Sequence, residues 1–296
     1  SPVGVLSNYT ITYNTADFTI TPKAASVTPD AASKIYGAAD PVFTGALTGF
    51  LPADSVTAAY SRVAGETVLG GPYAISATLA PAGLLSNYTI TYNTANFTIT
   101  PKGLTITGVV ANNKTYDRTT TATLNVSGAT LVGVLAPDVV TINSSAAIGA
   151  FASANAGSRA VTASGFGLTG AAGDYVLSAQ PTVPNATINP KGLTANGVIA
   201  NNKTYDRTVN VISFNLAGAS LVGIIAPDVV TLDSSAASGT FASVNAGAWA
   251  VTVSGFGVSN TNYTLSAQPT VPDATINPKG LTITGVLANN KTYDQT

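Results

Sequence analysis

Residues 7–23 read SNYTITYNTADFTITPK, and nearly the same stretch returns at residues 86–102 as SNYTITYNTANFTITPK. In the first copy Tyr9, Ile11 and Tyr13 alternate with threonines, and Phe18 and Ile20 alternate with threonines again. Alternation with a period of two is typical of a β-strand that buries one face. The stretch therefore predicts two successive strands, the second of which runs directly into a proline.

The end of this stretch marks a longer repeat. The tetrapeptide ITPK or INPK occurs at residues 20–23, 99–102, 188–191 and 276–279, so successive copies are 79, 89 and 88 residues apart. A fixed period indicates a tandem array, and periods of this length allow each unit to be a small domain. The predicted units are a C-terminal fragment at 1–23, complete repeats at 24–102, 103–191 and 192–279, and an N-terminal fragment at 280–296.

The repeats are of two types that share one plan. Residues 103–119 and 192–208 read GLTITGVVANNKTYDRT and GLTANGVIANNKTYDRT, and a third copy starts at Gly280, whereas the 24–102 repeat opens with AASVTPDAASKIYGAADPVF. All eight lysines occupy two positions per repeat, one after the junction proline and one two residues before a tyrosine. Each complete repeat also ends with an Asn-Tyr or Asp-Tyr pair ahead of its last strands. The two types are therefore expected to have one architecture.

The remaining strands follow from the same alternation. Candidates include residues 73–79, 228–232 and 250–256, and turn residues interrupt the apolar runs every 8 to 12 residues, as in a sandwich or small barrel. Residues 53–66 could form a short helix, but their valine and threonine content suits a strand as well. The expected fold is all-β: tandem small, immunoglobulin-like β-sandwiches arranged as an extended rod. The junction prolines fix φ and should stiffen the joints between repeats.

Composition excludes several classes of function. There are 12 Lys plus Arg against 13 Asp plus Glu, with a net charge of −1, so the chain lacks the basic surface that nucleic acid requires. No apolar run approaches the roughly 20 residues of a membrane-spanning helix, so no membrane insertion is expected in this segment. Cysteine is absent, which excludes disulfides and thiolate metal sites.

The opening segments carry a resemblance. KTYDRT after GLTITGVVANN resembles the bacterial YDG repeat, and KIYGAADP together with NYTITYNTANFTITPK resembles the YGX-type MBG repeat. This resemblance implies tandem stalk material of large exported bacterial surface proteins, similar to the adhesins of the filamentous haemagglutinin type. Where the YDG pattern has glycine, this chain has Arg118, Arg207 and Gln295. If that glycine has a positive φ, the turn is expected to be built differently here.

The sequence gives little support for a catalytic or metal site. Without histidine or cysteine the common bases and nucleophiles are missing, and no catalytic, cofactor-binding or metal-ligating residue is assigned. Asp117, Asp206, Asp138 and Asp228 recur in turn-like contexts, without the clustered carboxylates of a calcium loop, and are expected to be turn residues. The chain is therefore not expected to be an enzyme or to hold a cofactor.

Three further features invite a functional interpretation. Lys114 or Lys203 could form an isopeptide bond with an asparagine, although a lysine lying along the surface with its charge in water is the simpler interpretation. Trp249, the only tryptophan, stands where the previous repeat has Arg159, so both are expected to be exposed. The possible N-glycosylation sequons are at Asn8, Asn87, Asn96, Asn113, Asn125, Asn143, Asn185, Asn202, Asn262 and Asn290.

The sequence favours a non-catalytic stalk that projects a distal binding region from a bacterial cell surface. Its expected partners are the neighbouring repeats of the same chain. A second hypothesis is that like chains associate into an extracellular fibre, sheath or biofilm matrix, since low charge opposes association little and strand edges could pair. Binding of glycans by the repeats themselves would require a shared exposed aromatic residue, and the mismatch of Arg159 with Trp249 speaks against one.

Overall fold

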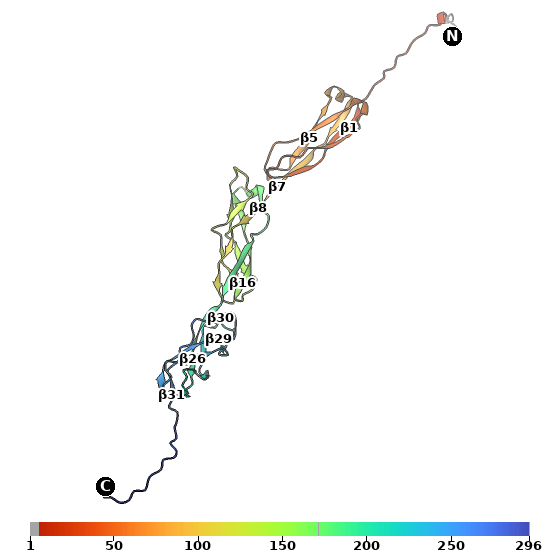
Figure 1. Ribbon diagram of the computed structural model, residues 1–296. Coiled ribbons are helices and arrows are strands. Elements are labelled where there is room, and N and C mark those ends of the chain that lie inside the picture. The colour runs from red at the N-terminus through yellow and green to blue at the C-terminus, as the bar shows by residue number, and fades with distance from the viewer. Residues whose placement is uncertain (1–5, 171, 296) are drawn as a thin grey trace. The chain divides into compact units, whose positions relative to one another are not determined.

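The computed structural model describes residues 6–170 and 172–295, and nearly every element in them is a strand (Figure 1). The prediction of an all-β tandem protein is therefore confirmed. The chain divides into two compact units. The first takes in residues up to Thr105 with Leu131–Asn143 and Gly167–Ala179, and the second takes in Ile106–Thr130, Ser144–Phe166 and the residues from Gln180 onward. The repeat boundaries remain a prediction from the sequence.

The 24–102 repeat lies wholly in the first unit and forms two sheets. One sheet has the strand order β3-β1-β6, and the other has the order β2-β7-β5-β4. The strands are β1 (Lys23–Pro29), β2 (Ala32–Ile35), β3 (Gly45–Thr48), β4 (Thr57–Arg62), β5 (Tyr73–Ala80), β6 (Tyr88–Tyr92) and β7 (Ala95–Thr100). Three short 3-10 helices accompany them: η1 (Leu6–Asn8), η2 (Pro52–Asp54) and η3 (Ala82–Asn87).

Alternating side chains of these strands make the core. Tyr73 and Ile75 of β5 pack with Phe97 and Ile99 of β7, and Val27 of β1 is fully buried. Asn96, Thr98 and Thr100 occupy the outward positions of β7. The burial pattern is therefore the one that the period of two predicts.

The two lysine positions are register positions of parallel strand pairs. The junction lysine immediately before each complete repeat pairs with the tyrosine of that repeat's Asn-Tyr or Asp-Tyr dipeptide: Lys23 with Tyr88, Lys102 with Tyr175 and Lys191 with Tyr263. The second pairs with an isoleucine of the last strand: Lys34 with Ile99, Lys114 with Ile188 and Lys203 with Ile276. The beginning and end of each repeat thus close on each other, and the two types share this closure.

Beyond Lys102, the first unit consists of parts of the 103–191 repeat. It contains the sheets β13-β8-β18 and β14-β17. Their elements are β8 (Lys102–Thr107), β13 (Thr130–Val132), β14 (Val140–Asn143), β17 (Gly167–Gly170), η4 (Ala172–Asp174) and β18 (Tyr175–Leu177). Only Pro101 separates β7 from β8, so no flexible linker lies between the last strand of one repeat and the first strand of the next.

The second unit contains the remaining strands of the 103–191 repeat and all of the 192–279 repeat. From the former come β9 (Val110–Ala111), β10 (Lys114–Thr115), β11 (Thr121–Ala122), β12 (Leu124–Asn125), β15 (Ile148–Phe151), β16 (Gly157–Ser164) and β19 (Val183–Asn189). From the latter come β20 (Lys191–Asn196), β21 (Ile199–Ala200), β22 (Lys203–Thr204), β23 (Phe214–Asn215), β24 (Ser220–Val222), β25 (Leu232–Asp233), β26 (Ser238–Phe241), β27 (Gly247–Trp249), β28 (Val251–Ser254), β29 (Gly257–Val258), β30 (Tyr263–Leu265) and β31 (Ala274–Asn277). The largest sheet has the order β10-β19-β16-β15-β11.

Two predicted strands are not formed. Residues 9–22 have no regular structure, and Tyr13, Phe18 and Ile20 are exposed. The almost identical residues 88–100 form β6 and β7 because β1 and β2 of the same repeat pair with them. Alternation of apolar and polar residues gives a strand one buried and one exposed face. A strand is stable, however, only when its backbone forms hydrogen bonds with a partner strand.

Two of the other predicted strands are confirmed with shifted bounds, and the strand predicted at residues 228–232 is wrong for all but its last residue. Residues 73–79 lie in β5, residues 250–256 contain β28, and only Leu232 of residues 228–232 enters a strand, β25. The ambiguous residues 53–66 contain the end of η2 and then β4, so the strand interpretation holds. No helix within the described residues is long and apolar enough to cross a membrane.

Candidate functional site

The most distinctive polar site joins the 24–102 repeat to the next one. The Tyr36 hydroxyl donates a hydrogen bond to Asp138 Oδ2 at 2.9 Å, and the Tyr175 hydroxyl donates to the same oxygen at 2.6 Å. The two rings meet edge to face, with centroids 5.3 Å apart and planes at 73°. The Leu135 N–H donates to the Tyr175 hydroxyl at 3.1 Å, which leaves that hydroxyl both donating and accepting.

The same arrangement recurs between the 103–191 and 192–279 repeats. Tyr116 and Tyr263 donate to Asp228 Oδ2 at 2.8 and 2.7 Å, and the Ile225 N–H donates to the Tyr263 hydroxyl at 3.1 Å. The ring centroids are again 5.3 Å apart, with planes at 74°. We call each arrangement a Tyr–Asp–Tyr cluster. It consists of the tyrosine two residues after Lys34 or Lys114 in one repeat, together with the aspartate and the tail tyrosine of the next repeat. It lies at both junctions between complete repeats.

Apolar packing accompanies the second cluster. Tyr116 and Ile188 of one repeat belong to the same buried core cluster as Leu193, Val230 and Tyr263 of the next. The hydrophobic core is therefore continuous through this junction, and the polar cluster sits within it.

Hydrogen bonding and burial shift the pKa values of the clusters in opposite directions. The hydrogen bond to Asp138, with a smaller contribution from burial, raises the pKa of Tyr36 to about 12. Burial and the hydrogen bond to Asp228 raise the pKa of Tyr116, while the hydroxyls of Tyr263 and Tyr116 lower the pKa of Asp228. The second cluster is thus stabilised with both phenols neutral and the Asp228 carboxylate ionised.

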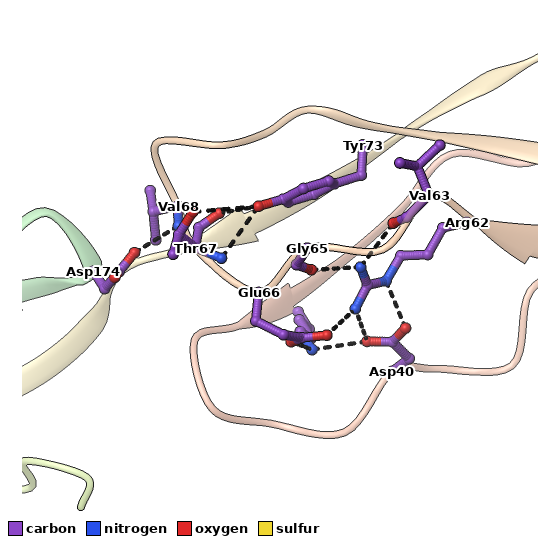
Figure 2. Close-up of polar contacts among 10 residues, drawn as sticks. Asp40, Arg62, Val63, Gly65, Glu66, Thr67, Val68, Tyr73 and Asp174 are labelled. Carbon is purple, nitrogen blue, oxygen red and sulfur yellow. Dashed lines mark hydrogen bonds and ion pairs between the residues drawn. The ribbon is translucent and has the colours of Figure 1, made fainter. Parts of the chain in front are cut away.

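A second hydrogen bond crosses each junction beside the cluster. At the first, the Val68 N–H donates to Asp174 Oδ1 at 2.6 Å, as Figure 2 shows. At the second, the Ala156 N–H donates to Asn262 Oδ1 at 2.8 Å, and the Asn262 amide donates to Asn155 Oδ1 at 3.2 Å. Asp174 and Asn262 are the residues that precede the tail tyrosines, so the whole dipeptide contacts the preceding repeat.

In the 24–102 repeat, an ion-pair network holds the loop that supplies Val68. Arg62 pairs with Asp40 at 2.6 Å and with Glu66, and its guanidinium donates to the carbonyls of Val63 and Gly65 (Figure 2). Lys34 pairs with Asp40 at 2.8 Å and with Glu66. Arg62 and Lys34 lower the pKa of Asp40 to about 2. This network fixes residues 62–66, immediately before the segment that contacts the next repeat.

In the other two repeats, Arg159 and Trp249 hold the corresponding loop. Arg159 Nε donates to the Asn155 carbonyl at 3.0 Å, and Trp249 Nε1 donates to the Asn245 carbonyl at 2.8 Å. Both side chains are half-buried, and Trp249 packs against the core beside Phe241. The expectation that both are exposed is wrong, because each closes the loop that precedes its own strand. The two side chains differ, but each has an N–H group that donates to the backbone carbonyl four residues earlier.

Arg118 adds an ion pair to the second junction. Its Nε lies 3.0 Å from Asp228 Oδ1, and its Nη1 donates to the Ala226 carbonyl at 2.8 Å. The residue has a φ of 68°, and Arg207 and Gln295 have φ of 69° and 60°. The turn therefore keeps the left-handed conformation that favours glycine, and the expectation of a differently built turn is wrong.

At the first junction a glycine is required. Gly37 follows Tyr36 with a φ of 78°, and a Cβ on it would lie 2.1 Å from Leu135 Cδ1. Leu135 belongs to the turn that ends at Asp138, whose N–H donates to the Leu135 carbonyl at 2.8 Å. The side chain of the next repeat therefore occupies the space that a larger residue would need.

In the complete repeats, the lysines two residues before the tyrosines are largely buried, with side chains 5%, 18% and 0% exposed at Lys34, Lys114 and Lys203. The Lys203 side chain is 0% exposed, and its Nζ donates to Asp206 Oδ1 at 2.8 Å and to the carbonyl and hydroxyl of Thr208. Lys114 makes the same contacts with Asp117 and Thr119. The interpretation of Lys203 as a surface lysine is wrong, and the amine contacts Asp and Thr oxygens instead of the asparagine that an isopeptide bond would use.

The other candidate residues have structural roles. Asp117 and Asp206 each accept the N–H two residues on, so the Asx-turn interpretation is confirmed. Among the sequon asparagines, Asn113 and Asn202 accept strand N–H groups and Asn262 contacts the preceding repeat. Within residues 6–170 and 172–295, no group of three acidic side chains could hold a metal ion.

Sequence reasoning treated the cluster residues separately and missed their contact. It placed Tyr116 in a repeated motif and Asp228 in a repeated turn, and it noted Tyr263 in the tail. The available signal was their joint recurrence in every complete repeat. The hydrogen bonds between successive repeats join residues more than 100 positions apart in the sequence, so local patterns do not reveal them.

Comparison with known proteins gives two family matches. The MBG domain model (YGX type) matches residues 25–98, and the YDG domain model matches residues 100–183 and 189–271. No curated protein and no solved structure matches the chain.

Proposed function

Because the chain belongs to the YDG domain family and carries an MBG domain of the YGX type ahead of its two YDG domains, we propose that it is a non-catalytic spacer. In this role it forms part of the stalk of a large exported bacterial adhesin. The stalk projects a distal binding region away from the cell surface, and the repeats act outside the cell.

The observation that supports a spacer most is the recurrence of the Tyr–Asp–Tyr cluster at both junctions. A spacer transmits position only if each repeat is fixed on its neighbour. Both junctions have a charge-assisted hydrogen-bond network, a second hydrogen bond beside it and no intervening linker. These contacts fix one repeat on its neighbour. The tyrosines and the aspartate of the cluster are engaged in hydrogen bonds with one another, which suits a structural role.

Spin-label distances across one junction test this proposal. The chain has no cysteine, so Thr162→Cys and Thr252→Cys place single labels on exposed strand positions in adjacent repeats. We expect a narrow distance distribution by pulsed electron paramagnetic resonance. Asp228→Ala should broaden it, whereas Asp233→Ala, which removes only a local turn contact to Ser235, should leave it narrow.

A broad distribution in the chain without either alanine substitution would contradict the spacer role, because the repeats would then not hold a set distance. A distribution that stays narrow in Asp228→Ala would instead place the stiffness outside the cluster.

A further inference from the structure

In both YDG domains, a short segment of the same domain covers the outer edge of one strand. In the first YDG domain, β11 pairs antiparallel with β15, and the Phe151 N–H donates to the Thr120 carbonyl at 2.7 Å. In the second, the Phe241 N–H of β26 donates to the Val209 carbonyl at 2.8 Å. The segment that follows the Lys-Thr-Tyr motif therefore satisfies the backbone groups of this edge in both domains.

The MBG domain has the same sheet without the covering strand. Its order is β2-β7-β5-β4, against β10-β19-β16-β15-β11 in the first YDG domain. The first strand of each sheet carries the corresponding lysine, Lys34 or Lys114, so the two orders can be compared strand by strand. The strand β4 stands where β15 stands, and no strand of the described residues stands where β11 does.

The uncovered edge of β4 presents the backbone groups of three residues. The Val63 N–H donates to the Ala74 carbonyl at 3.0 Å and continues the antiparallel register of β4 with β5. Because the direction of hydrogen bonding alternates along a strand, the N–H and C=O groups of Ala58, Tyr60 and Arg62 point away from β5. Within the described residues, these backbone groups have no hydrogen-bond partner.

The side chains of β4 do not guard this edge. The strand reads TAAYSR and has neither the proline nor the lysine that commonly protects an edge strand. Its one charged residue, Arg62, is only 7% exposed, because its guanidinium pairs with Asp40 and Glu66. An open hollow of about 490 Å³ lies beside the strand, and Phe43 and Tyr60 line it together with these three residues.

The missing strand is a property of the MBG domain itself. At both junctions between complete repeats, the hydrogen bonds and ion pairs come from the turn aspartate and tail dipeptide of one repeat and from loops of the other, and none involves β4 or β15. Where this edge is covered, the covering segment belongs to the same domain. A repeat before or after the MBG domain therefore does not replace the strand.

We propose that β4 pairs antiparallel with β4 of a second copy of this chain, about a two-fold axis through Tyr60. In this register Tyr60 lies opposite Tyr60 of the second copy, and Ala58 lies opposite Arg62. Three residues on each strand then exchange about six backbone hydrogen bonds. The sheet β2-β7-β5-β4 of one copy continues into the same sheet of the other.

Two observations favour a second copy over an unrelated extended peptide. A single added strand would leave its own outer edge unpaired, whereas pairing of two β4 strands satisfies both edges at once. The side chains also suit a two-fold pair. Arg62 lies opposite an alanine and not opposite a like charge, and the outward residues Thr57, Ala59 and Ser61 are small and uncharged. This association goes beyond the spacer role, since a spacer needs contacts only along its own chain.

Sedimentation velocity of the intact chain over a range of concentrations tests the proposal. We expect a reversible monomer–dimer equilibrium. Ala58→Pro removes an N–H group that points away from β5, so it should leave the sheet of the monomer intact, as circular dichroism would show. It should weaken dimerisation about tenfold or more, because two backbone hydrogen bonds are lost across the two-fold axis.

A charge swap tests the register. In the proposed dimer Ala59 lies opposite Ser61 of the second copy, so the double variant Ala59→Lys with Ser61→Lys sets like charges against each other and should stay monomeric. The double variant Ala59→Glu with Ser61→Glu should do the same, and a mixture of the two should form a heterodimer. The control variant Asn96→Lys with Thr98→Lys adds the same charges to exposed positions of β7, away from the edge, and should dimerise as the original chain does.

A chain that stays monomeric at the highest concentration would overturn the proposal. A dimer that the lysine pair at positions 59 and 61 leaves unchanged would overturn it as well, and this arm decides the question even if Ala58→Pro fails to fold. The spin labels at positions 162 and 252 lie in the YDG domains, so neither result alters the distances expected within one chain. Failure of this proposal is therefore distinguishable from failure of the spacer proposal.

Discussion

The rings of Tyr116 and Tyr263, which belong to successive repeats, meet edge to face at 5.3 Å while both hydroxyls donate to one oxygen of Asp228. Removing a carboxylate from water costs free energy unless it is hydrogen-bonded, and for the partly buried Asp228 two phenols and an arginine supply the partners. Neither repeat can satisfy the group fully alone. The arrangement therefore makes the stability of one repeat depend on the presence of its neighbour.

Arg118 and Arg207 form a matched pair for measuring the worth of the inter-repeat ion pair. Both are arginines in the left-handed region, but only Arg118 contacts the next repeat within the described residues. Glycine relieves about 1 kcal/mol of backbone strain at such a position. Arg207→Gly should therefore be neutral or slightly stabilising in thermal denaturation, whereas Arg118→Gly should be less stable by about 1 kcal/mol or more. Equal effects of the two substitutions would show that the ion pair contributes nothing.

Gly37→Ala tests close packing at the first junction. The added Cβ would meet Leu135 Cδ1 at 2.1 Å, and alanine is strained at a φ of 78°. We expect a loss of about 1–3 kcal/mol in the free energy of unfolding. The double variant Gly37→Ala with Leu135→Ala should recover the steric part of the loss beyond the cost of Leu135→Ala alone. Strictly additive losses would assign the whole effect to backbone strain.

Alkaline pH should weaken the first cluster. The pKa of Tyr36 is raised to about 12 from an ordinary value near 10. The hydrogen bond therefore contributes its full stability below about pH 10 and loses it as the pH rises toward 12. Thermal melts between pH 8 and 12 should show a falling melting temperature above pH 10. Tyr36→Phe should have a shallower fall, and an identical pH profile would contradict the assignment.

Acid should weaken the network that holds residues 62–66. The pKa of Asp40 is lowered to about 2 by Arg62 and Lys34, against about 3.9 in an unfolded chain. Its contribution is present above pH 4 and is lost as the pH falls from 4 to 2. Circular dichroism melts should show this loss, and Asp40→Asn should reduce the slope in that window.

The all-β fold, the repeats and the shared plan of the two types were predictable because each depends on short-range alternation or on plain recurrence. Even the lysine positions carried information, since they mark strand register: Lys34 lies opposite Ile99, and Lys203 lies opposite Ile276. The alternation pattern alone does not show which of the two nearly identical segments forms strands. Residues 88–100 are strands and residues 9–21 are not, because strand formation depends on a partner strand and not on the segment alone.

The junction residues were predictable as recurring residues but not as a site. Asp138 and Asp228 look like ordinary turn aspartates, and only the three-dimensional fold brings the tyrosines of two repeats to them. Arg159 and Trp249 misled in the same way. Because one is charged and the other aromatic, a shared surface position was the natural expectation, whereas their common feature is a side-chain N–H that reaches a loop carbonyl.

The most direct test of coupling between repeats uses Trp249, the only tryptophan, as a reporter of the 192–279 repeat. Tyr116→Phe removes one hydroxyl from the preceding repeat, and a double-mutant cycle with Asp228→Ala isolates its interaction with the carboxylate. From urea unfolding followed by Trp249 fluorescence, we expect a coupling free energy of about 1–2 kcal/mol. The Tyr205 hydroxyl has no partner within the described residues, so Tyr205→Phe should leave the free energy of unfolding unchanged. A coupling of zero, with Tyr116→Phe as silent as Tyr205→Phe, would contradict the claim that the Tyr–Asp–Tyr cluster joins the repeats.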